Sequence, residues 1–135
     1  MLVAGVLASS ICATSIEKLP RSLKGYELYS WSEDSQWHFT LITGTNRLKT
    51  IEEITSEGDS ISETGWVKIH VVGADAIKDV LGRLPEGESV FWCDELHIEQ
   101  SMERDLQLPP ERIADAIEEY AKQRGLDFVV RVRSY

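Results

Sequence analysis

Alternating apolar and polar residues mark two short segments in the first third of the chain, residues 26–31 and 37–42. A period of two residues is typical of β-strands that bury one face, and both segments are rich in aromatic side chains. The residues between them, Ser32 to Gln36, are turn formers, and a connection this short makes the two strands antiparallel neighbours. The pattern therefore predicts a β-hairpin.

Helical and strand patterns alternate along the rest of the chain. A short helix is expected to begin at Thr50, because Thr50 and Glu53 can form a capping box. Apolar residues at helical spacing predict a second helix between Gly73 and Pro85 and a third, the longest, that Gly125 ends. The remaining patterns predict strands at residues 66–72, 89–95 and 126–132 and a polar loop at residues 57–65.

This order of elements, ββαβαβαβ, predicts an α+β fold, a two-layer α/β sandwich with a mixed sheet of about five strands and helices mainly on one face. The strands alternate instead of being apolar throughout, so the other sheet face is expected to stay partly open. The polar residues expected on this open face are His38, Thr40, Lys68, His70, Arg131 and Arg133. They form either a binding surface or an ordinary solvated face.

Tryptophan 66 differs from the other tryptophans in its predicted surroundings. Large rings in strands usually build the core or its rim, and this accounts for most of the tryptophans of the chain. Trp66, however, shares a predicted polar side with Lys68 and His70. An aromatic side chain exposed beside cations is suited to contact a sugar or a peptide, so Trp66 is a candidate binding residue.

At 135 residues the chain is long enough for one domain with a core of its own, which we expect over residues 16–135. Its 23 acidic and 14 basic residues give a formal net charge of −9. This charge repels a phosphate backbone, so nucleic acids are disfavoured as partners. An acidic surface also keeps a protein soluble, which accounts for most of the charge without a function.

The first fifteen residues, MLVAGVLASSICATS, contain no charged side chain. An apolar run followed by small residues is typical of an export signal, which predicts a periplasmic or extracellular protein cleaved after Ser15. The positively charged start of such signals is missing, so an apolar first helix or strand is the alternative. The run is too short for a transmembrane segment, and lipid attachment at Cys12 is disfavoured because Ile11 stands where a small residue is needed.

Three motifs of the hairpin region and the helix after it, GYELYSW, WHFTL and GTNRLKTIEEI, resemble a group of small, mostly exported bacterial proteins of unknown function. The resemblance extends to WVKIHVVGADAIKDVLGRLPEGESVFW and so covers most of the region after residue 15. It implies a compact α+β domain. It supplies no catalytic residues.

The loop after the hairpin is a candidate anion site. It contains Thr45, Asn46, Arg47 and Lys49, and it joins the end of a predicted strand to the start of a predicted helix. Backbone donors at such a place, together with two cations, suit a carboxylate or a phosphate. The alternative is that Thr45 and Asn46 stabilise turns and that Arg47 pairs with a nearby glutamate.

Cys93, Glu95, His97 and Glu99 alternate, so on a straight strand they would share one face and offer sulfur, oxygen and nitrogen to a metal ion. The alternative is that Cys93 is a small buried residue. No motif places a base beside Cys93 or a serine, as nucleophilic catalysis requires. No cofactor is expected.

The sequence thus favours an exported, non-catalytic binding or interaction module whose partner is a small anionic ligand or a protein. The alternative is a small hydrolase or metal-dependent enzyme centred on Cys93, Glu95 and His97, which requires these side chains to converge in a pocket. A homodimer is a further possibility if the last predicted strand lies at a sheet edge.

Overall fold

A computed structural model provides the structure of the protein and describes residues 25–54, 66–96 and 105–132. The elements follow the predicted order ββαβαβαβ, with a short 3-10 turn before the first helix. They are β1 (Tyr26–Glu33), β2 (Gln36–Thr43), η1 (Thr45–Arg47), α2 (Leu48–Ile54), β3 (Val67–Val72), α3 (Ala74–Gly82), β4 (Ser89–Cys93), α4 (Glu111–Gln123) and β5 (Asp127–Val132).

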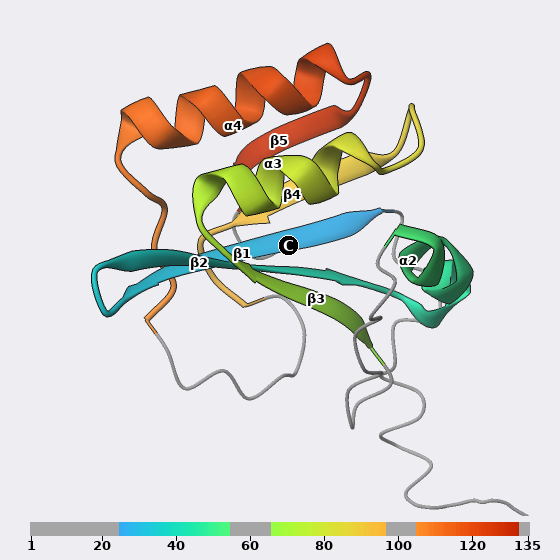
Figure 1. The fold of residues 1–135 in the computed structure, drawn as a ribbon, viewed down its shortest axis with the longest axis horizontal. Helices are drawn as coiled ribbons and strands as arrows, with labels where there is room; N and C mark the ends of the chain where they lie inside the picture. The colour runs from blue at the N-terminus through green and yellow to red at the C-terminus, as the bar shows by residue number, and fades with distance from the viewer. Residues whose placement is uncertain (1–24, 55–65, 97–104, 133–135) are drawn as a thin grey trace, which may run out of the picture.

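The strands form one mixed five-stranded sheet in the order β3-β2-β1-β4-β5. β2 is antiparallel to both β1 and β3, whereas β4 is parallel to β1 and to β5. Figure 1 shows α3 and α4 together over one face of the sheet and α2 at one end of it. This arrangement confirms the predicted two-layer α+β sandwich.

The hairpin turn is shorter than predicted. Only Asp34 and Ser35 lie between β1 and β2, and both have positive φ, 54° and 63°. A two-residue turn of this kind matches the twist of the flanking strands. It places Leu28 opposite Leu41 and Trp31 opposite His38, so that apolar residues share one face and Trp31 shares the other with His38.

The main core lies between the helices and the first face of the sheet. Trp92 of β4 is at its centre, fully buried, with its ring 6.1 Å from that of Phe128 and 6.0 Å from that of Phe39. Its Nε1 donates to the hydroxyl of Ser30 at 3.1 Å. The helices supply the other side of this core with Ile51, Ile54, Ile77, Val80, Leu81, Ala114, Ile117 and Ala121.

The second face of the sheet, opposite α3 and α4, carries a smaller apolar cluster of Tyr29, Ile42, Trp66 and Cys93. The prediction of an exposed Trp66 is therefore wrong, because this ring is only 4% exposed and packs in the cluster. Thr40, expected on an open face, is also 4% exposed. The alternation of polar and apolar residues correctly identified the second face of the sheet. The centre of that face is nevertheless buried.

β5 is an edge strand of the sheet, and its ladder with β4 is irregular. Trp92 is the partner of Val130 and Cys93 is the partner of Val132, so the ladder skips Arg131. Arg131 has a φ of 67°, which is unusual for a residue other than glycine. Val129, earlier in the strand, is 42% exposed.

One local prediction needs correction, and several others fall outside the described residues. α2 begins at Leu48, because η1 runs directly into it, so Thr50 lies within the helix and does not cap it. The expected export signal, the loop at residues 57–65, His97 and Arg133 all lie outside the described residues. Among the described helices, none has the length and apolar character needed to cross a bilayer.

Candidate functional site

Two imidazole rings meet on the second face of the sheet. His38 of β2 and His70 of β3 lie on neighbouring antiparallel strands, where His70 is the partner of Thr40 and His38 is the partner of Val72. The Nδ1 atom of His38 is 3.0 Å from the Nε2 atom of His70. Their ring centres are 5.3 Å apart and the ring planes differ by only 10°. One of these two nitrogens therefore carries a proton and donates a hydrogen bond to the other.

Trp31 completes this group, which we call the histidine–tryptophan cluster (Trp31, His38 and His70). The indole lies 5.4 Å from the His38 ring and 5.6 Å from the His70 ring, with interplanar angles of 16° and 9°. Its Nε1 donates to a carboxylate oxygen of Glu33 at 3.0 Å. The indole is 5% exposed, so it is a fixed platform beside two more accessible imidazoles.

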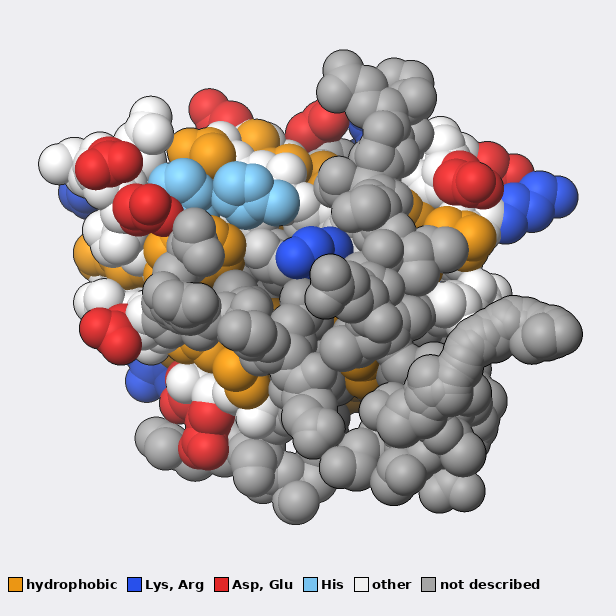
Figure 2. Space-filling view, turned by 90° about the horizontal axis from the view of Figure 1, so that it is seen from below, with side chains coloured by type: hydrophobic (Ala, Val, Ile, Leu, Met, Phe, Trp, Pro, Cys, Tyr) orange, Lys and Arg blue, Asp and Glu red, His pale blue; other side chains and the backbone are white. Residues whose placement is uncertain are grey.

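The cluster continues into a surface of mixed chemistry at the edge of the sheet. Lys68 precedes His70 by two residues on β3 and so points to the same side, and Val72 is 39% exposed. We call Trp31, His38, Lys68, His70 and Val72 the β2–β3 surface. Figure 2 shows the two described histidine side chains next to each other on this side of the molecule.

The loop predicted to bind an anion uses its arginine within the fold. Arg47 forms a 3.2 Å ion pair with Glu88 and lies 5.5 Å over the ring of Tyr26. The predicted alternative, in which Arg47 pairs with a glutamate, is therefore confirmed. Burial and the negative charge of Glu88 raise the pKa of Tyr26 to about 12, and the positive charge of Arg47 acts in the opposite direction.

The remaining residues of this loop are Thr45, Asn46 and Lys49, and all three are exposed. They do not converge with the β2–β3 surface in any contact that the structure shows. The loop keeps one exposed cation, Lys49, after Arg47 is paired. Its geometry supports an anion site less well than the sequence did.

Cys93 is buried at the end of β4, and its thiol donates to the carbonyl oxygen of Phe91 at 3.3 Å. Burial raises the pKa of Cys93 well above its usual value, and the negative charge of Glu27 raises it further, against a smaller opposing effect of the Tyr29 hydroxyl. Glu27 itself is buried and accepts a hydrogen bond from Tyr29. The thiol is thus kept protonated, whereas a nucleophilic or metal-binding cysteine requires the thiolate.

Of the other members of the predicted Cys93 group, only Glu95 lies within the described residues, and it is exposed after β4. His97 and Glu99 lie outside the described residues. Within the described part of the chain, no three His, Cys, Asp or Glu side chains are grouped so that they could hold a metal ion.

Cys93 is expected to resist alkylation in the folded protein. In a Cys12→Ser variant, where Cys93 is the only thiol of the chain, iodoacetamide at pH 8 should react at least about a hundredfold more slowly with the native than with the denatured protein. The modified fraction is measured by intact mass over time. Rapid modification of the native protein would contradict the buried, protonated thiol and would revive the hydrolase hypothesis.

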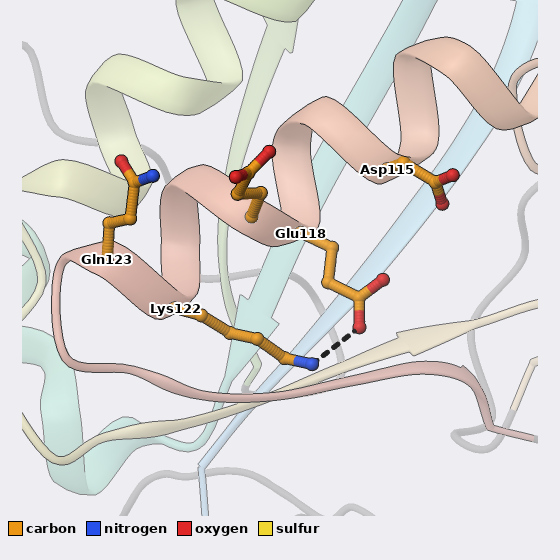
Figure 3. A pocket seen from close by; sticks show the side chains of 5 residues that line it. Asp115, Glu118, Lys122 and Gln123 are labelled. Carbon is orange, nitrogen blue, oxygen red and sulfur yellow. Dashed lines mark ion pairs between the residues drawn. The ribbon is translucent and has the colours of Figure 1, made fainter.

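An open pocket lies along the outer side of α4, lined by Asp115, Glu118, Glu119, Lys122 and Gln123. Figure 3 shows these side chains on successive turns of this one helix. Lys122 pairs with Glu118 at 2.9 Å, the helical spacing of four residues that stabilises exposed helices. These polar side chains form the solvated face of an amphipathic helix, and this accounts for the pocket without a binding function.

The fold and the β2–β3 surface define a small α+β domain with one helix-covered sheet face and an aromatic and basic surface on the other. Comparisons of the chain with protein-family models, with curated proteins and with solved structures found no match.

Sequence reasoning named His38, Lys68 and His70 but assigned Trp31 to the core or its rim. The missed signal was the register of the hairpin. A turn spanning Ser32 to Gln36 would place Trp31 opposite Trp37, whereas the two-residue turn places it opposite His38. Matching the apolar positions of both strands across the hairpin requires the second register and so reveals the histidine partner.

Proposed function

We propose that this chain is a non-catalytic binding module and that it uses the β2–β3 surface to bind an acidic segment of a protein partner. The observation that carries the proposal is the histidine–tryptophan cluster, two imidazoles and an indole in mutual contact on one sheet face. The proposal includes export, which the uncharged first fifteen residues predict.

The chemistry of this surface suits carboxylates on a partner. Imidazole N–H groups and the ammonium of Lys68 can donate hydrogen bonds to carboxylate oxygens. Val72 adds exposed apolar area beside them. The buried indole of Trp31 packs against both imidazoles and so reduces the conformational entropy that they lose on binding.

The position of the surface in the sheet supports a protein partner rather than a deeply enclosed small molecule. β3 is the edge strand on this side of the sheet, and His70 and Val72 are both exposed on it. An edge strand is accessible to an extended partner segment. Cys93, the centre of the enzyme alternative, is by contrast a buried and protonated thiol.

The proposal is tested by NMR titration of the ¹⁵N-labelled protein, with EDTA present, against two synthetic peptides of equal length, one of alternating Glu and Ala and one of alternating Lys and Ala. We expect the acidic peptide to shift the backbone signals of residues 68–72 and the indole signal of Trp31, and the shifts to diminish with added salt. The basic peptide should leave these signals unchanged.

Variants separate this surface from the loop at residues 45–49. Lys68→Ala is expected to weaken the acidic peptide about fivefold, since a partly exposed charge contact contributes about 1 kcal/mol. Lys49→Ala removes a lysine of the other candidate site and should leave the affinity unchanged. Shifts that map to residues 45–49, or equal effects of the two variants, would contradict the proposal.

A further inference from the structure

The His38–His70 pair has the separation of two nitrogens that share a metal ion. Zinc–nitrogen bonds of about 2.0–2.1 Å with angles between about 90° and 109° hold two nitrogens roughly 2.8–3.4 Å apart. The observed distance between His38 Nδ1 and His70 Nε2 is 3.0 Å. We propose that these two nitrogens bind one divalent transition-metal ion, of the kind for which imidazole is a preferred ligand, at the edge of the β2–β3 surface.

The sheet fixes the two side chains at this separation before a metal arrives. His38 and His70 lie on the same face of adjacent strands because Thr40, the partner of His70, is two residues from His38. Trp31 stacks against both rings and is itself held by its hydrogen bond to Glu33. Ligands that are already in place spend less conformational entropy on binding than ligands on loops.

Binding requires a lone pair on both nitrogens, whereas the hydrogen bond between them places a proton on one. A tautomeric shift of the donor ring satisfies this requirement without loss of a proton, because each neutral imidazole carries its proton on either nitrogen. The metal-bound pair therefore carries its protons on Nε2 of His38 and on Nδ1 of His70. A bound ion lies roughly 1.4 Å from the line that joins the two nitrogens, so each ring has to turn by roughly 40° to direct its lone pair at the ion.

Two charged side chains near the histidine pair have opposite effects on the binding of a cation. The carboxylate of Glu33, which accepts from Trp31, favours a cation, and the ammonium of Lys68 on the same side of β3 disfavours one. Two protein nitrogens leave further coordination positions for water or for a carboxylate of a bound molecule. A metal at this place would thus present an accessible Lewis acid on the surface.

The inference does not rest on the proposed partner binding, because its test uses the metal ion alone. Calorimetry with ZnCl₂ and with CuCl₂ is expected to show one ion bound per chain, with copper the tighter of the two. With ZnCl₂, the ¹⁵N spectra of the imidazoles should show coordination at Nδ1 of His38 and at Nε2 of His70, with the remaining nitrogen of each ring protonated.

The three histidines of the chain supply matched variants. His38→Ala and His70→Ala should each weaken zinc at least about tenfold, because a single imidazole loses the advantage of the second, tethered ligand. His97→Ala removes the third histidine and should leave the affinity unchanged, and Lys68→Ala should leave it unchanged or raise it. Circular dichroism confirms that each variant is folded.

Three outcomes would overturn the inference. One is the absence of zinc or copper binding at millimolar metal. Another is an equal loss of affinity in all three histidine variants, which would indicate scattered weak sites. The last is imidazole coordination through the opposite nitrogens, Nε2 of His38 and Nδ1 of His70. None of these outcomes would affect the peptide titration, which is done with EDTA present.

Discussion

Replacement of Trp92 by alanine is expected to lower the free energy of unfolding by about 3–5 kcal/mol. Trp92 is fully buried at the centre of the main core, between the rings of Phe39 and Phe128. Its removal leaves a cavity that the two parallel neighbours of β4 cannot close, and it also leaves the Ser30 hydroxyl without the indole donor. Equilibrium unfolding in urea measures the loss.

Trp37→Ala is the matched control for this prediction, since it removes the same side chain from the same face of the sheet. Trp37 is only partly buried and packs at the periphery of the core. Its replacement should cost clearly less than that of Trp92, because partly exposed side chains lose less buried area. If both variants lost the same free energy of unfolding, the central position of Trp92 in the core would be contradicted.

Gly25→Ala is expected to cost about 3 kcal/mol, although it adds a single methyl group. A Cβ atom at position 25 would lie 2.2 Å from the carbonyl oxygen of Ser89. This obstacle is backbone, so relief requires that the start of β1 move away from β4 where the two strands begin to pair. Gly25 also accepts a hydrogen bond from Thr43 through its carbonyl oxygen, which such a movement would strain.

Gly82→Ala is the matched control for Gly25→Ala, because the obstacle at Gly82 is a side chain and not backbone. A Cβ atom there would lie 2.6 Å from the hydroxyl of Tyr120, which is the far end of a side chain that can turn aside. Gly82 is the last residue of α3, where alanine is also favoured over glycine, by less than the roughly 1 kcal/mol of a helix interior. Gly82→Ala should therefore be nearly neutral or stabilising in urea unfolding. A loss at Gly82 as large as that at Gly25 would contradict the backbone argument.

Local patterns in the sequence predicted the elements of this fold well, because periodicity and turn formers act within a few residues. Both hairpin strands, the order of elements and the helix before Gly125 follow from such signals. The burial of Trp66 could not be predicted in this way. It depends on contacts with Tyr29, Ile42 and Cys93, which are distant in the sequence and meet only when the strands are ordered.

The candidate site shows the same division between local and distant information. His38, Lys68 and His70 could be placed on one sheet face by alternation, but their contact depends on β3 lying beside β2, and spacing along the chain does not specify strand order. For Arg47, a distant residue removed a predicted site instead of completing one. Its loop suggested an anion site, but Glu88, which is 41 residues away, takes the guanidinium.

The irregular end of β5 limits how a second copy of the chain could pair with this edge of the sheet. A strand arriving at the edge of a sheet needs a continuous row of backbone donors and acceptors. At Arg131 this row is interrupted, because the residue has a positive φ and is skipped by the ladder. A second copy could extend the sheet in register only along the first part of β5, from Asp127 to Val130. The bulge thus shortens the part of this edge with which a strand of a second copy could pair.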